Sequence, residues 1–121
     1  MARILIVKDN KSARAFMELA LISRGYEVMS AGDGGEALAL QNERPADVLV
    51  TELLGRDGTQ TIADFRSNFP DIKIIVTYAG PGAAPGTGRR GPARGVGADY
   101  FLLKPFTLRD LLSSIALLAA A

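Results

Sequence analysis

The sequence predicts a doubly wound α/β domain built around a mostly parallel sheet. Short apolar runs rich in β-branched residues alternate with segments in which apolar residues recur at helical spacing. Most connections between these segments are short, as they are in repeated strand–helix units. The chain has 121 residues, of which 48% are hydrophobic and 22% charged, so we expect one globular domain over residues 1–121.

The first half of the chain predicts two strands and two helices. Residues 4–7 form an apolar run that ends at a charged pair, which is typical of a strand buried on both faces. Apolar residues follow at helical spacing over residues 13–21, and Gly25 supplies the stop. Residues 27–30 form a weaker strand candidate. Residues 33–36 have the spacing of a capping box, which predicts a helix that continues to about Arg44.

The second half predicts three more strands, at residues 47–51, 73–77 and 100–103. Residues 59–68 are expected to form a helix, closed by the Phe-Pro pair that follows. Thr107 and Asp110 form a second capping box and predict the start of the last helix. The apolar face of this helix comprises Leu108, Leu111, Leu112, Ile115 and Leu118.

Residues 79–98 interrupt the alternation, because a fourth connecting helix is expected there. They hold seven Gly, three Pro, three Arg and no acidic residue. Inside a helix, Gly costs about 1 kcal/mol and Pro about 3 kcal/mol relative to Ala. We therefore expect a long flexible Gly/Pro-rich loop in place of that helix.

The same segment contains a G-x-G-x-x-G spacing at residues 86–91. A dinucleotide site requires this turn to leave a strand directly and to open a helix, and neither condition holds here. Two interpretations remain for the arginines of the segment. They grip an acidic partner or a nucleotide phosphate, or they belong to a solvated loop, which we favour; these residues are Arg89, Arg90 and Arg94.

The composition excludes several classes of protein. The chain has no Cys and no His, which rules out disulfides, thiol catalysis, zinc sites of the usual kind and serine–histidine triads. A net charge of +1 argues against nucleic acid as a partner. No apolar run approaches the roughly 20 residues of a membrane span, and the first run is too short for a secretory signal. We therefore expect no membrane partner and a cytoplasmic protein.

Polar residues gather where the predicted strands end. In open α/β sheets ligands bind beyond the carboxyl ends of the strands, so these residues mark the candidate site. One such residue alone means little, because strands commonly end in solvated polar residues. Matches on four strands together point to a site, made of Lys8, Asp9, Glu52, Thr77 and Lys104.

These positions resemble a known family. The runs ILIV-Lys8-Asp9-Asn10, ADVLVT-Glu52, IIV-Thr77 and GADYFLL-Lys104-Pro105-Phe106 are similar to the response-regulator receiver domain (CheY-like), the phosphoacceptor module of bacterial two-component signalling. The resemblance covers the whole chain, and its closing motif is the most specific part. It implies a flavodoxin-like parallel sheet of five strands in the order 2-1-3-4-5, flanked by helices.

The resemblance also implies roles for single residues. In the family, two acidic residues after the first strand and an Asp after the third bind Mg²⁺, and that Asp accepts a phosphoryl group from a histidine kinase. Asp9 matches the second acidic position, and Thr77 and Lys104 match the phosphate-binding positions. The aromatic position that reports the switch falls on Phe101, and Pro105 is the candidate for a cis peptide bond.

Two positions depart from the pattern. Lys8 stands where the first acidic residue is expected, and Glu52 stands where the phosphoacceptor Asp is expected. Asp9 and Glu52 are thus balanced by Lys8 and Lys104, which removes most of the electrostatic attraction for Mg²⁺. We expect weak or absent Mg²⁺ binding, with Asp9 as the only residual ligand, no other cofactor and no phosphorylation.

Glu52 itself allows two interpretations. Its carboxylate either mimics a phosphorylated Asp by reaching Thr77 or Lys104, or it pairs with Lys8 and fills space, which we favour. A packed position is likewise favoured over a switching role for Phe101.

These observations predict a stand-alone, atypical receiver that is not an enzyme. It acts by phosphorylation-independent binding of a histidine kinase or another signalling protein, as a monomer or weak dimer, and the loop arginines are candidates for the contact. The alternative is a Mg²⁺-dependent phosphotransfer receiver with an unusual acceptor site.

Overall fold

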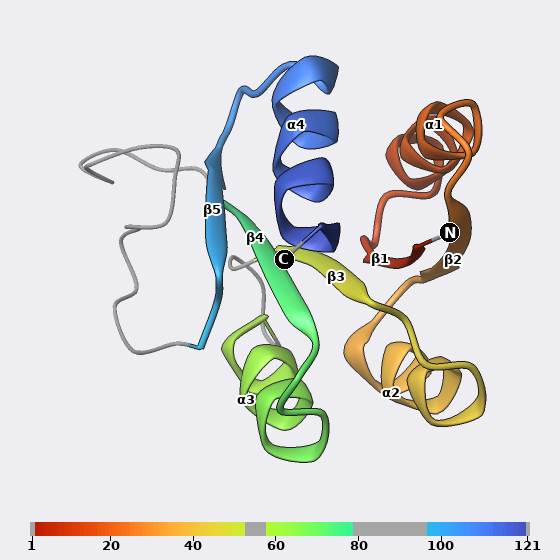
Figure 1. The fold of residues 1–121 in the computed structure, drawn as a ribbon. Coiled ribbons are helices and arrows are strands. Elements are labelled where there is room, and N and C mark those ends of the chain that lie inside the picture. The colour runs from red at the N-terminus through yellow and green to blue at the C-terminus, as the bar shows by residue number, and fades with distance from the viewer. Residues whose placement is uncertain (1, 53–57, 79–96, 121) are drawn as a thin grey trace.

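The fold is a five-stranded parallel sheet with helices on both faces (Figure 1). The computed structural model describes residues 2–52, 58–78 and 97–120. Neighbouring strands follow the order β2-β1-β3-β4-β5, as the sequence predicts, and every pair is parallel. The strands are β1 (Arg3–Val7), β2 (Glu27–Ala31), β3 (Val48–Glu52), β4 (Lys73–Tyr78) and β5 (Tyr100–Leu103).

Four helices lie in the described part of the chain: α1 (Lys11–Ile22), α2 (Gly34–Glu43), α3 (Gly58–Asn68) and α4 (Leu108–Ala119). Helices α1 and α4 cover one face of the sheet, and α2 and α3 cover the other (Figure 1). Side chains on successive residues of a strand point to opposite faces, so each strand contributes to two cores. In β1, Ile4 and Ile6 belong to the core under α1 and α4, whereas Leu5 and Val7 belong to the core under α2 and α3.

Capping side chains mark the starts of α2 and α4, as the sequence predicts. The Asp33 carboxylate accepts a hydrogen bond from the Glu36 backbone N–H at the start of α2. At the start of α4, the Thr107 hydroxyl accepts from the Asp110 N–H while the Asp110 carboxylate accepts from the Thr107 N–H. This reciprocal pair is the predicted capping box.

The remaining differences from the sequence-based prediction are small. Helix α1 starts two residues earlier than predicted, because Asn10 caps it by accepting from the Ala13 N–H. Strand β3 starts at Val48, one residue late, and the Asp47 carboxylate instead accepts the Arg3 backbone N–H. Of the predicted loop at residues 79–98, only the last two residues are described. The loop arginines Arg89, Arg90 and Arg94 lie outside the described residues, as does the turn at residues 53–57.

Candidate functional site

The carboxyl ends of four parallel strands bring the predicted site residues to one edge of the sheet. Lys8 directly follows β1, Glu52 is the last residue of β3, and Lys104 directly follows β5. Thr77 lies in β4, in register with Glu52 on the neighbouring strand, and is buried. The topology thus assembles residues that are far apart in the chain.

The Glu52 carboxylate lies between two lysines. One oxygen, Oε1, accepts a hydrogen bond from the Lys8 ammonium, and the other, Oε2, lies 3.2 Å from the Lys104 Nζ. The side chains of Glu52, Lys8 and Lys104 are 24%, 18% and 30% exposed. Because β4 lies between β3 and β5, the Lys104 side chain reaches across the end of β4 to make this contact. One carboxylate is therefore the shared counter-charge of two partly buried cations.

The two lysines favour the ionised form of Glu52. Burial raises the pKa of this carboxyl, but the hydrogen bonds from Lys8 and Lys104 outweigh that effect and hold the pKa below its usual value. Glu52 is therefore a carboxylate near neutral pH. Both of its oxygens already accept from a cation.

Asp9 differs from Glu52 in its surroundings. Its side chain is exposed, and none of the residues described by the structure bonds it. The backbone before it is held firmly, because the Lys8 carbonyl accepts from Arg14 Nη1 at 2.6 Å and the Lys8 N–H donates to the Ala31 carbonyl at 3.0 Å. Sequence reasoning missed Arg14, because a bond from a helix side chain to a backbone carbonyl has no sequence signature.

The end of β5 matches the pattern that the resemblance implies. The Lys104–Pro105 peptide bond is cis. The Lys104 N–H donates to the Tyr78 carbonyl at 2.7 Å, which continues the pairing of β4 and β5 past the last strand residue. Phe101 is 4% exposed, and its ring meets that of Tyr78 edge-on at 6.1 Å between centroids and 83° between planes. In this structure Phe101 is a packed core residue.

Arg66 of α3 ties the start of β5 to the rest of the fold, and sequence reasoning missed it too. Its Nε and Nη2 donate to the Gly97 carbonyl at 3.0 and 2.7 Å, and Nη2 lies 2.9 Å from Asp99 Oδ2. Nη1 donates to the Pro70 and Ile72 carbonyls, at 2.9 Å each. The only cue in the sequence is a cation near the end of a predicted helix, which does not reveal five bonds.

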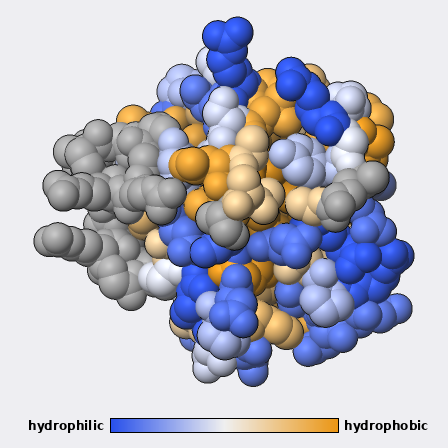
Figure 2. Space-filling view, viewed as in Figure 1, coloured by the Kyte–Doolittle hydropathy of each residue, from blue (hydrophilic) through white to orange (hydrophobic). Residues whose placement is uncertain are grey.

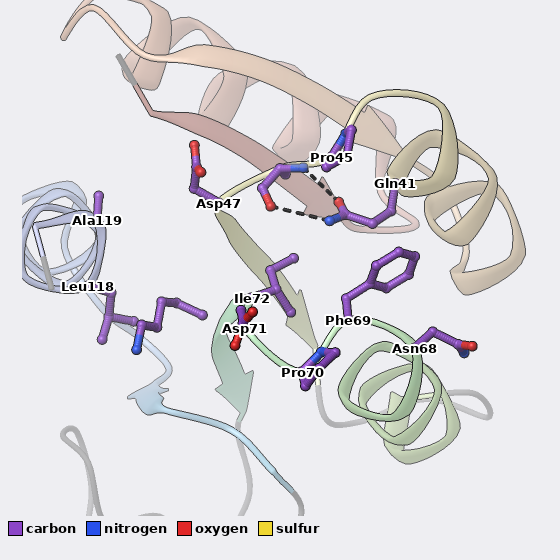
Figure 3. Close-up of a pocket in the computed structure, with 12 residues that line it drawn as sticks. Gln41, Pro45, Asp47, Asn68, Phe69, Pro70, Asp71, Ile72, Leu118 and Ala119 are labelled. Carbon is purple, nitrogen blue, oxygen red and sulfur yellow. Dashed lines mark hydrogen bonds between the residues drawn. The ribbon is translucent and has the colours of Figure 1, made fainter.

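A separate cavity of about 430 Å³ lies at the opposite, amino-terminal edge of the sheet (Figure 3). Phe69, Ile72 and Leu118 supply apolar lining. Gln41 is buried at its wall, and its amide satisfies both backbone polar groups of Ala46, at 2.9 and 3.2 Å. The cavity shares no residue with the Glu52 site.

Two further properties of the described residues bear on function. No group of three or more His, Cys, Asp or Glu side chains converges there in a way that could hold a metal ion. No helix among them has the length and hydrophobicity needed to cross a membrane.

Comparison with known proteins agrees with this fold. The family model of the response regulator receiver domain matches residues 4–116. Response regulator MprA of Mycobacterium sp. (strain KMS) is 36% identical over 113 residues, which are 92% of this chain and 47% of that protein. MprA of Mycobacterium leprae is 34% identical over 115 residues, 93% of this chain and 49% of that protein. The chain spans about half the length of these relatives.

Solved structures share the fold along nearly the whole chain. A CheY-like receiver domain protein of Methanospirillum hungatei JF-1 superimposes with a TM-score of 0.83 at 26% identity, covering 99% of this chain and 94% of that one. The chemotaxis response regulator CheY4 of Vibrio cholerae gives 0.81 at 28% identity and covers 98% of both chains. With the sheet order and the family match, these likenesses show that the chain belongs to the response regulator receiver domain family of two-component signalling.

Proposed function

We propose that this receiver is atypical: it signals by binding another protein, without phosphorylation and without enzymatic activity. The observation that carries the proposal is the Glu52 carboxylate held between Lys8 and Lys104. At the position of the phosphoacceptor, a Glu rather than an Asp has both of its oxygens engaged by ammonium groups. A nucleophilic attack on a phosphoryl donor would require breaking at least one of these ion pairs.

The donor set also argues against Mg²⁺. This cation is hard, prefers oxygen ligands and is usually held by one or two carboxylates with water. Of the two carboxylates at this site, Asp9 makes no ion pair with a described residue, whereas Glu52 is paired with the Lys8 and Lys104 ammonium groups. With Asp9 and Glu52 set against Lys8 and Lys104, the site has no net negative charge to attract a divalent cation. The residues present therefore do not fit the metal.

Exposed apolar residues support a role in protein binding. Helix α1 presents Phe16, Leu19 and Ile22 at 63%, 70% and 53% exposure. Large apolar side chains gathered on one helix face commonly mark an interaction site. The relatives are response regulators, so we expect the partner to be a histidine kinase or another signalling protein.

A second candidate is a Mg²⁺-dependent phosphotransfer receiver with an unusual acceptor. The retained Asp9, the buried Thr77 and Lys104 favour it, because they match the family pattern. Its weakness is the acceptor position itself, where Glu52 is already paired with two cations.

An amide NMR titration with Mg²⁺ plus beryllofluoride, a phosphoryl mimic, separates the two. We expect no saturable shifts at Asp9, Glu52, Thr77 and Lys104, and no label uptake from acetyl phosphate. Saturable shifts at these residues that spread to Phe101 would overturn the proposal. Label uptake that disappears in Asp9→Asn would establish the second candidate.

A further inference from the structure

A groove runs along helix α4 beside the end of α1. Its volume is about 470 Å³, and its lining consists of Arg24, Leu108, Arg109, Leu112, Ser113 and Ala116. Figure 2 shows hydrophobic side chains exposed between α4 and α1 at the top of the view, with strongly hydrophilic side chains on either side. We infer that this groove is a docking site for an acidic amphipathic helix of a partner protein.

The shape of the apolar strip favours a helix. Leu108, Leu112 and Ala116 follow one another at intervals of four residues, so they form one continuous row along α4. At 1.5 Å per residue this row is about 12 Å long, which matches about two turns of a second helix. Leu108 is 37% exposed, and Leu112 is half-buried because it packs against the core. The row therefore offers an apolar surface that the core supports.

The charges of the groove select the partner. Helices α1 and α4 both run from the carboxyl edge of the sheet to its amino edge, because each follows the end of one strand. Arg109, in the first turn of α4, and Arg24, just past the end of α1, therefore stand toward opposite ends of the groove. The lining contains no acidic residue, and the nearby Asp110 carboxylate is turned back to the Thr107 N–H.

Both guanidinium groups are available. Over residues 2–52, 58–78 and 97–120, neither the Arg24 nor the Arg109 side chain makes a hydrogen bond or an ion pair. A partner helix with aliphatic residues on one face and carboxylates toward both ends would complement them. A second copy of this chain fits poorly, because a self-complementary contact would bring these arginines together.

The inference rests on the proposed function in one respect, that the chain acts by binding protein. It does not require the Glu52 site to be inert. Failure of peptide binding would leave the beryllofluoride result standing, and beryllofluoride binding would leave the groove intact.

Two synthetic helix-forming peptides of about three turns test the inference. Both carry leucines along one face, and one has glutamates toward both ends where the other has lysines. Fluorescence anisotropy measures the affinity, and amide NMR locates the contact. We expect the glutamate peptide to bind at least about tenfold more tightly, a difference of the size that charge complementarity provides. The shifts should fall on residues 108–116 and Arg24, and equal affinities or shifts elsewhere would overturn the inference.

Charge-reversal variants sharpen the test. Arg24→Glu combined with Arg109→Glu should make the lysine peptide the tighter binder. Each single variant should lower the affinity for the glutamate peptide. Lys11→Glu makes the same charge change on the exposed first turn of α1, outside the groove, and should leave the affinity unchanged. Ala116→Gln places a longer polar side chain in the groove. Because Gln is well accepted in helices, this variant should lower the affinity for the glutamate peptide without unfolding the protein.

Two other occupants give distinct results. Sedimentation of the unmodified chain as a dimer that Arg24→Glu converts to a monomer would assign the groove to a second copy. If the chain binds anionic phosphatidylserine vesicles and binds neither peptide, the groove would be assigned to a membrane surface. Either result contradicts a protein helix as the occupant.

Discussion

Lys104 reaches across the end of β4 to Glu52, so that its Nζ lies 3.2 Å from Oε2. Together with the Lys8 contact on Oε1, this links the ends of β1, β3 and β5 through a single carboxylate. The arrangement has a structural consequence besides its bearing on phosphorylation. It places an ion-pair network across the edge of the sheet at which these parallel strands end.

Replacing Glu52 by Gln should therefore destabilise the fold. The two ammonium groups would lose their counter-charge while staying partly buried, a loss of about 1–3 kcal/mol in the free energy of unfolding. Urea denaturation followed by circular dichroism measures it. Asp9→Asn is the matched control, since Asp9 is exposed and bonded to none of the described residues, and it should change stability little. A Glu52→Gln variant as stable as the unmodified chain would contradict a stabilising network.

The same carboxyl should make stability depend on pH. The pKa of Glu52 lies below its ordinary value of 4.5 in the fold, so the unfolded chain binds more protons in the window beneath that value. Stabilisation by Glu52 is then present above about pH 4.5 and is lost as the pH falls through the folded pKa. Urea denaturation across this range should show the gap between the unmodified chain and Glu52→Gln closing toward acid pH.

Glu27 provides the comparison for this titration. Its pKa is also lowered, first by the hydrogen bond from Arg3, but its carboxylate is more exposed than that of Glu52. Solvent screens such surface pairs. The difference in the free energy of unfolding between the unmodified chain and Glu27→Gln should therefore change less over the same pH range than the difference for Glu52→Gln. If the stability difference between the unmodified chain and Glu52→Gln stays constant with pH, the ion pairs do not lower the pKa of Glu52 in the fold.

Gly34 should resist substitution for a steric reason. It starts α2 against Thr61 of α3, and a Cβ added there would lie 2.2 Å from the Thr61 Oγ1. Thr61 is buried, so Gly34→Ala forces the two helices apart and should cost about 1–3 kcal/mol. Gly35→Ala is the control, because its added Cβ lies 3.4 Å from an exposed Asp33 oxygen. Thermal unfolding distinguishes them, and removing the hydroxyl in Gly34→Ala/Thr61→Ala should recover much of the loss.

The sequence predicts the fold better than it predicts the bonds of the site. The alternation of β-branched runs and helical spacing is a local signal, and the sheet order follows from the resemblance that the end-of-strand residues carry. The pairing of Lys8 with Glu52 can also be predicted from the sequence, because β1 and β3 are neighbours in that order. The reach of Lys104 across β4 and the five bonds of Arg66 depend on side-chain conformations, which no spacing encodes.

Restoring acidic residues at positions 8 and 52 tests whether these two departures from the family pattern control metal binding. Lys8→Asp combined with Glu52→Asp would place three carboxylates, with Asp9, against the single ammonium of Lys104. Such a cluster repels itself unless a hard cation joins it, so we expect saturable Mg²⁺-dependent amide shifts at Asp9 in this variant and none in the unmodified chain. Beryllofluoride should then add shifts at Thr77 and Lys104.

The control for this experiment keeps side-chain size and removes the added charge. Lys8→Asn combined with Glu52→Asn offers no new carboxylate and should not bind Mg²⁺. If the rebuilt variant stays silent while remaining folded, the two substitutions are not what separates this chain from metal binding. If the unmodified chain already binds Mg²⁺ at Asp9, the charge balance with Lys8 does not control the site. Binding in the rebuilt variant alone would tie the loss of metal chemistry to these two residues.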